Sequence, residues 1–120
     1  MIVAIQGTRA FKEYSVFLGA MHRILALVED SGDKDISVFG IGPNNINAMG
    51  QGFCNITEKS LKAMGISIRF RRRPIGWLEQ NLHNLDEFLY FCVAKENTSR
   101  QVDAADVKDD VCNPQIYRYD

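Results

Sequence analysis

Hydrophobic residues recur along the chain at two alternating spacings, and this pattern predicts strands that alternate with helices. Continuous apolar runs at residues 1–5 and 88–93, and the mostly apolar segment 36–39, are typical of buried strands. Residues 12–29 and 46–64 instead carry apolar side chains every three or four positions, which predicts two long amphipathic helices. The order of these segments is strand, helix, strand, helix, with the most continuous apolar run near the end of the chain.

Shorter elements complete this pattern in the second half of the chain. Residues 66–70 alternate apolar and polar side chains, so we expect a strand with one buried face at an edge of the sheet. A helical or irregular piece follows Pro74, residues 102–111 predict a short acidic helix, and residues 115–119 predict a last strand.

Strands that alternate with helices imply βαβ units with right-handed crossovers. The predicted fold class is therefore α/β, a small Rossmann-like three-layer sandwich with a mostly parallel sheet of about five strands. A length of 120 residues, 46% of them hydrophobic, predicts a single domain over residues 1–120. Gly50 and Gly52 fall inside the second long helix, where a glycine costs about 1 kcal/mol relative to alanine, so we expect close packing on the sheet or a break there.

Composition excludes several classes of function. The formal net charge of −1 gives no overall field that attracts nucleic acid or an anionic membrane, so neither is expected as a partner. No basic leader precedes the first apolar run and no apolar run approaches bilayer length, which predicts a cytoplasmic location. The cysteines, Cys54, Cys92 and Cys112, are too widely spaced for a zinc site or a disulfide framework, and we expect them reduced and at least half-buried. No metal and no cofactor are predicted.

Three polar turns directly follow predicted strands, at residues 6–11, 40–47 and 95–101. Because ligands of open α/β sheets bind at the carboxyl ends of the strands, these turns form one site if the first, second and fourth strands are neighbours. Backbone N–H groups and the positive end of a helix dipole at such a place suit an anion or a nucleotide. The candidate ligand-binding residues are Gln6, Gly7, Thr8, Arg9 and Phe11 in the first turn, Gly40, Gly42, Asn44, Asn45 and Asn47 in the second, and Lys95, Asn97, Ser99 and Arg100 in the third.

Most of these residues have a plainer role as an alternative. Arg9 suits a bidentate contact with phosphate, or a surface pair with Glu13. Thr8 suits a phosphate contact or a helix cap, and Phe11, with Tyr14, suits stacking on a base or a place in the core. The asparagines of the second turn offer amides to ribose or a base edge, although an Asx turn and a helix cap account for two of them.

Two further groups of residues have weaker functional alternatives. Arg69, Arg71, Arg72 and Arg73 form a dense basic cluster, which is either a solvated edge that discourages aggregation or a phosphate or nucleic-acid patch near Trp77. We assign no catalytic residue. The carboxylates considered as general bases are Glu58, Glu79 and Glu96, of which Glu96 is the best placed.

The motifs at the ends of the first two strands resemble those of a known superfamily. Residues 3–11, with Tyr14, resemble the "strand, G-[ST]-R-x-F, helix" start of the SLOG superfamily, especially its small YspA-like branch. Residues 40–47 resemble its second, Gly-rich turn, and residues 64–68 resemble its "G-[IV]-x-[IV]" entry to the third strand. The resemblance implies a Rossmann-like domain that binds a nucleotide or a nucleotide-derived ligand.

The chain departs from the superfamily pattern at two places. Asn47 stands where an acidic residue is usual. The enzymatic LOG branch, which cleaves the N-glycosidic bond of nucleoside monophosphates, has P-G-G-x-G-T-x-x-E after the fourth strand, whereas residues 95–101 of this chain contain no glycine. Lys95, Ser99 and Arg100 offer side-chain donors in place of those backbone amides.

Three hypotheses follow. The first is a protein that binds a nucleotide or an ADP-ribose-type signalling molecule without turnover, as a sensor or as a sequestering protein such as a virus uses against nucleotide-based host immunity. The second is a nucleotide N-glycosidase or phosphoribohydrolase-like enzyme that uses Arg9 and Glu96. The third is a nucleic-acid or protein interaction module that uses residues 69–73. Apolar faces on both long helices further predict a homo-oligomer, most simply a dimer through one of them.

Overall fold

The computed structural model describes residues 1–119, which form one parallel sheet between two layers of helices. The elements in chain order are β1 (Ile2–Gly7), α1 (Tyr14–Ser31), β2 (Asp35–Ile41), α2 (Asn44–Ala63), β3 (Ser67–Arg73), α3 (Ile75–Asn81), the 3-10 turn η1 (Leu82–Asn84), β4 (Glu87–Val93), α4 (Arg100–Asp106) and β5 (Gln115–Tyr119). All the strand pairs are parallel, in the order β3-β2-β1-β4-β5. This is the order of the first five strands of a Rossmann fold.

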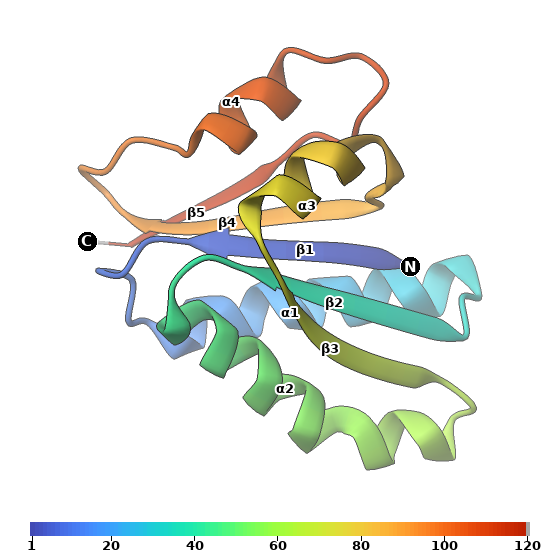
Figure 1. The fold of residues 1–120 in the computed structure, drawn as a ribbon. Coiled ribbons are helices and arrows are strands. Elements are labelled where there is room, and N and C mark those ends of the chain that lie inside the picture. The colour runs from blue at the N-terminus through green and yellow to red at the C-terminus, as the bar shows by residue number, and fades with distance from the viewer. Residues whose placement is uncertain (120) are drawn as a thin grey trace.

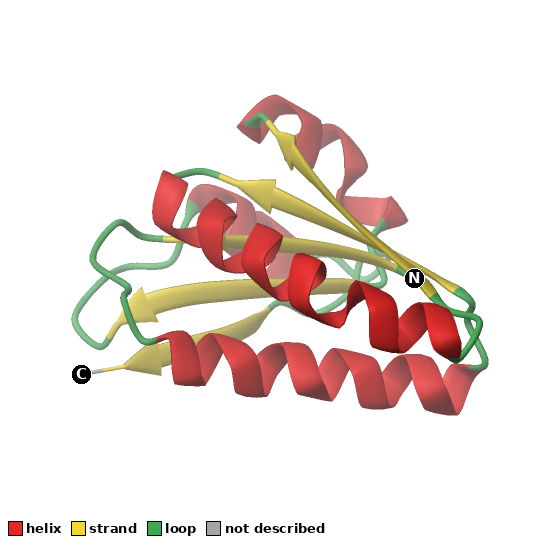
Figure 2. Cartoon of the chain, turned by 90° about the horizontal axis from the view of Figure 1, so that it is seen from below, coloured by secondary structure: helices red, strands yellow, loops and turns green. Residues whose placement is uncertain are grey.

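The helices lie on both faces of the sheet. Figures 1 and 2 show α1 and α2 side by side on one face, with α3 and α4 on the other. The predicted α/β class, the three layers and the parallel sheet are therefore confirmed. β1 lies between β2 and β4, so the first, second and fourth strands are neighbours, as the predicted site requires. The acidic helix was predicted at residues 102–111 and was placed wrongly, because α4 begins two residues earlier, at Arg100, and ends at Asp106.

The core has two parts, one on each face of the sheet. On the α1 and α2 side, Phe91 of β4 stacks on Tyr117 of β5 and packs against Phe11 and Phe17, with ring centroids between 5.1 and 5.3 Å apart. On the other side, α3 and α4 pack on β1, β2 and β4 through Leu78, Val102 and their neighbours. β4 is buried on both faces, as its continuous apolar run predicts.

The two glycines of α2 differ in their surroundings. A Cβ at Gly50 would lie 2.6 Å from both Ile5 Cδ1 and Phe70 Cε1, whereas a Cβ at Gly52 would meet nothing within 4 Å. α2 runs unbroken through both positions. Close packing on the sheet is therefore confirmed at Gly50, and a break in the helix is not formed.

This contrast gives a matched pair of substitutions. We expect Gly50→Ala to lower the free energy of unfolding by about 1–2 kcal/mol, because the methyl group overpacks a site closed by Ile5 and Phe70. Gly52→Ala is expected to raise it by about 0.5–1 kcal/mol through helix propensity alone. Urea unfolding followed by circular dichroism measures both. A stabilised Gly50→Ala variant would contradict the packing at this position.

The apolar stripes that motivated the dimer prediction lie mainly in the core. Phe17, Met21 and Ile24 of α1 are fully buried against the sheet. Ile56 of α2 and Met64, at the C-cap of that helix, remain exposed, at 75% and 56% of their surface. The homo-oligomer stays a prediction. No helix within residues 1–119 is long and apolar enough to cross a bilayer.

Candidate functional site

A polar hollow of about 770 Å³ lies at the carboxyl ends of β1 and β2. Its lining residues are Gly7, Thr8, Arg9, Gly42, Pro43, Asn44 and Asn45. Six of these seven were predicted as ligand-binding residues, and they come from two turns that are more than 30 positions apart in the chain. The sheet brings these turns together because β1 and β2 are paired in parallel and end at the same edge.

The first turn places a free cation at the rim of the hollow. β1 ends at Gly7, and the N–H of Thr8 donates to the carbonyl of Phe91 at 3.0 Å, which fixes the start of the turn. Arg9 is exposed, and its guanidinium makes no hydrogen bond or ion pair within residues 1–119. The pair with Glu13 considered from the sequence is therefore not formed, and Arg9 is free to bind an anion.

The second turn leads directly into an uncapped helix. Gly42 has a φ of +100°, a left-handed conformation that favours glycine. Pro43 then occupies the N-cap of α2 in an extended conformation, and no side chain caps the helix. Because Pro43 has no side-chain acceptor, the first N–H groups of α2 and the positive end of its dipole are open to the hollow. Capping by Asn44 or Asn45 was a wrong expectation.

Each asparagine of the second turn has its own structural partner. Asn45 Nδ2 donates to the carbonyls of Thr8 at 3.0 Å and Phe11 at 2.8 Å, and so ties the two turns together. Asn44 Oδ1 accepts a hydrogen bond from Arg72 at 2.9 Å, which holds a second guanidinium beside the hollow. The position of Arg72 on the α2 side of the sheet could be predicted from the sequence, because alternation along β3 places it on the side opposite Arg71 and Arg73.

Asn47 and Gly40 lie below the hollow and do not line it. Asn47 is only 5% exposed, and its Nδ2 donates to the carbonyls of Gly42 at 3.1 Å and Pro43 at 3.4 Å. The Asn47 Oδ1 has no hydrogen-bond partner within the described chain. A Cβ added at Gly40 would lie only 2.0 Å from this oxygen. The structural role of both residues is therefore to form the turn, in place of the ligand contact predicted for them.

The third turn is joined to the first by direct hydrogen bonds. Thr8 Oγ1 donates to Glu96 Oε1 at 2.5 Å, and the same oxygen accepts from the N–H of Val93 at 2.9 Å. Ser99 Oγ donates to Gln6 Oε1 at 2.6 Å and accepts the N–H of Val102, so that it also caps α4. These hydrogen bonds hold together the turns that follow β1 and β4.

A buried pair of amide side chains, Gln6 and Gln101, also connects the first and third turns. Gln6 Nε2 donates to Gln101 Oε1 at 3.1 Å, and Gln101 Nε2 donates to Glu79 Oε2 at 3.2 Å. The crevice between β1 and β4, where sheets of this order usually bind a nucleotide, is thus filled by side chains of the protein. Gln6 and Ser99 are among the side chains that fill this crevice. Lys95, Asn97 and Arg100 are exposed and do not line the hollow, so the site has two turns where three were predicted.

The aromatic candidates differ in exposure. Phe11 has no exposed surface, so it offers no face to a base and belongs to the core. Tyr14 is 38% exposed and packs on Phe17 with ring centroids 5.9 Å apart. Of the two rings considered for stacking, Tyr14 alone reaches the surface.

The carboxylates considered as general bases lie outside the hollow. The hydrogen bonds from Thr8 and from the Val93 N–H lower the pKa of Glu96, so this group remains a carboxylate near neutral pH. Glu79 lies on α3 beside Gln101, and Glu58 lies on α2 near the amino end of β3. No lining residue of the hollow carries a carboxylate.

The titratable groups elsewhere in the molecule offer no metal site. Residues 1–119 hold no group of three or more His, Cys, Asp or Glu side chains that could bind a metal ion. Burial raises the pKa of Cys54 to about 12 and that of Cys112 to about 11, and it also raises the pKa of Cys92. These thiols are therefore poor nucleophiles.

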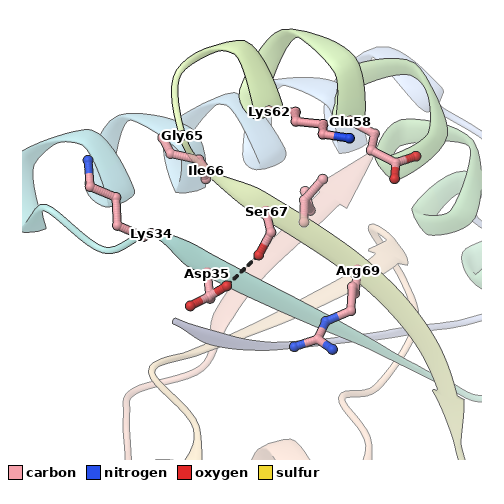
Figure 3. Close-up of a pocket in the computed structure, with 9 residues that line it drawn as sticks. Lys34, Asp35, Glu58, Lys62, Gly65, Ile66, Ser67 and Arg69 are labelled. Carbon is pink, nitrogen blue, oxygen red and sulfur yellow. Dashed lines mark hydrogen bonds between the residues drawn. The ribbon is translucent and has the colours of Figure 1, made fainter.

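A second hollow, of about 500 Å³, lies at the opposite end of the sheet between α2 and the start of β3. Figure 3 shows Lys34, Lys62 and Arg69 together with Asp35 and Glu58 around it, and the Ser67 hydroxyl donates to Asp35. Its charges are mixed, and it lies at the amino ends of the strands, where α2 has ended and no helix of residues 1–119 begins. The hollow at the carboxyl ends is therefore the better candidate for an anion site.

Comparisons of the chain with protein-family models, with curated proteins and with solved structures found no match. Membership of the SLOG superfamily stays a prediction from the motifs at residues 3–11, 40–47 and 64–68. The class that the fold defines is a small Rossmann-like α/β protein with a polar hollow at the carboxyl edge of its sheet.

Proposed function

We propose that the protein binds a nucleotide or an ADP-ribose-type signalling molecule in this hollow and holds it without turnover, as a sensor or a sequestering protein. The observation that carries the proposal is the uncapped start of α2, which opens on the same hollow as the guanidinium of Arg9. Backbone N–H groups at a helix N-terminus and an arginine together form the usual protein environment of a phosphate group.

The size and polarity of the hollow support a ligand of this class. A volume of about 770 Å³ lies within the range of small-molecule sites. Arg72, held by Asn44, adds a second cation near the rim. The Nδ2 of Asn45 donates to the carbonyls of Thr8 and Phe11. Its Oδ1 accepts no hydrogen bond within residues 1–119, so it is left as an acceptor for a ribose hydroxyl.

The absence of turnover in this proposal rests on Glu96. A general base must reach the reacting atoms of the substrate, but the Glu96 carboxylate is turned to Thr8 and Val93 and does not line the hollow. Since the lining carries no carboxylate within residues 1–119, the hollow has groups that bind and no group that takes a proton from water.

Calorimetry and native mass spectrometry against adenine nucleotides, ADP-ribose, cyclic ADP-ribose variants and cyclic dinucleotides test the proposal. We expect Arg9→Ala to weaken binding by about 10- to 100-fold, since a charge-assisted hydrogen bond contributes about 1.5–3 kcal/mol. The matched control is Arg100→Ala, which removes an exposed arginine outside the hollow and should leave the affinity unchanged.

Two results would count against this function. Binding of none of these ligands, or equal losses from Arg9→Ala and Arg100→Ala, would remove the hollow as the site. Release of free base or of another product, detected by chromatography after long incubation with nucleoside monophosphates, would show turnover and favour the N-glycosidase alternative.

A further inference from the structure

The β3 edge of the sheet has no helix of the described residues packed on it on the α3 and α4 side. Figure 1 shows α3 and α4 gathered over the middle of the sheet and the β5 edge, with β3 at the opposite edge. Within residues 1–119, no β3 side chain belongs to the core cluster that α3 and α4 form. A shallow hollow of about 230 Å³ lies on this open face of β2 and β3, lined by Ser37, Val38, Phe39, Arg69, Arg71 and Arg73. We call this surface the β2–β3 face.

Three arginines of β3 point to the β2–β3 face. Ile68 and Phe70 are buried in the core cluster on the α2 side, so alternation directs Arg69, Arg71 and Arg73 to the other side. Figure 3 shows Arg69 on the side of β3 opposite Glu58 and Lys62 of α2. Residues two apart on a parallel strand are about 6.6 Å apart, so the cations form an evenly spaced row.

The three arginines of this row form no ion pair within the described residues. The ion pairs of residues 1–119 are Arg23 with Glu87 and the N-terminal amine with Asp33, and neither involves β3. Asp35, at the start of β2, accepts a hydrogen bond from the Ser67 hydroxyl. Asp35 also lines the mixed-charge hollow to which Arg69 contributes, at the amino end of the row. The lining of the hollow on the β2–β3 face itself has no acidic residue among residues 1–119, although the whole chain carries a net charge of −1.

Two aromatic rings lie at the carboxyl end of the row. Phe39 of β2 and Trp77 of α3 are half-buried, with ring centroids 4.5 Å apart, and the guanidinium of Arg73 lies 5.3 Å from the centre of the Phe39 ring. Aromatic side chains beside a row of cations form the usual surface for single-stranded nucleic acid, in which arginines track the backbone and rings stack on bases.

A charged edge strand also protects a sheet from pairing with another sheet. That role needs charge of either sign anywhere on the edge. It does not require three cations on one face, and it does not require aromatic rings beside them. The combination on the β2–β3 face therefore needs a further explanation.

We propose that the β2–β3 face binds single-stranded nucleic acid, with phosphates along Arg69, Arg71 and Arg73 and a base stacked at Trp77. The rings favour nucleic acid over an acidic peptide, which would use the cations and leave the aromatic pair without a partner. The surface is separate from the hollow at the ends of β1 and β2, so the two binding activities are independent.

Fluorescence anisotropy of a fluorescein-labelled oligothymidine, titrated with the full chain at several salt concentrations, tests the proposal. We expect binding at low salt that weakens steeply as salt rises. A triple Arg69→Gln, Arg71→Gln, Arg73→Gln variant should reduce the slope of log K against log salt by about 2, since each phosphate contact on a single strand contributes about 0.7. The matched control replaces the exposed Lys12, Lys59 and Lys108 by glutamine, which removes the same charge elsewhere and should leave the slope unchanged.

Trp77 supplies a second readout, because it is the only tryptophan in the chain. Stacking of a base should quench its fluorescence on addition of unlabelled oligothymidine, and the Arg9→Ala variant should show the same quenching. The proposal is overturned by a lack of binding at low salt, by equal losses in the arginine and lysine variants, or by unchanged Trp77 emission at saturation. Equal affinity for polyglutamate would assign the surface to an acidic protein, and equal affinity for duplex DNA would remove the preference for a single strand.

Discussion

An aspartate in place of Asn45 is expected to lower the free energy of unfolding by about 2–3 kcal/mol, because it removes two hydrogen bonds and sets a carboxylate against two carbonyl oxygens. In the native protein the Asn45 amide donates to the carbonyls of both Thr8 and Phe11, and so holds the β1 turn against the start of α2. Urea unfolding followed by circular dichroism measures the loss.

Asn44→Asp is the matched control for this change, since it makes the same substitution one residue earlier. Its carboxylate keeps the hydrogen bond from Arg72 and adds a negative charge at the N-terminus of α2, where it is favourable by about 0.5 kcal/mol. We expect its stability to be unchanged or slightly raised. Equal destabilisation by the two variants would contradict the specific role of Asn45.

Gly7→Ala is expected to lower the free energy of unfolding by about 2–3 kcal/mol through overpacking. A Cβ at Gly7 would lie 2.5 Å from the backbone carbonyl oxygen of Phe91 and 2.8 Å from Ile46 Cδ1. Since the Phe91 oxygen belongs to the backbone of a central strand, β1 must move away from β4 to make room. Thermal and urea unfolding of the variant measure the cost.

Gly19→Ala is the matched control for Gly7→Ala, because it adds a methyl group at a position with open space around it. A Cβ at Gly19, on the exposed side of α1, meets nothing within 4 Å, so we expect a gain of about 0.5–1 kcal/mol from helix propensity. A Gly7→Ala variant as stable as the wild-type protein would show that the close approach of β1 to β4 is not needed for the fold.

The fold could be predicted from the sequence because its signals are local. The continuous apolar run at residues 88–93 predicts a strand buried on both faces, and β4 is such a strand. The alternation at residues 66–70 predicts an edge strand, and β3 lies at an edge of the sheet. In both cases the spacing of apolar residues decides which faces are buried, and that spacing is readable without knowing the neighbours.

The roles of the polar residues could not be predicted in the same way. Asn45 and Asn47 are the same residue type two positions apart, yet one ties two turns together and the other is buried beneath its own turn. Gln6 lies at the end of β1 among residues that line the hollow, but its partners are Ser99 and Gln101, more than 90 positions away. An amide side chain takes whichever partner the tertiary fold presents, so its role depends on contacts that the sequence pattern does not specify.

The side chains that fill the crevice between β1 and β4 bear on selectivity. With Thr8 bound to Glu96 and Gln6 bound to Ser99, a ligand in the proposed site would lie beside that crevice, at the ends of β1 and β2, and not within it. Under the proposed function, the phosphate and the ribose contact the protein while the base extends into solvent. Such a protein would recognise the groups that nucleotide signals have in common and respond to many of them, where a closed pocket would distinguish one from another.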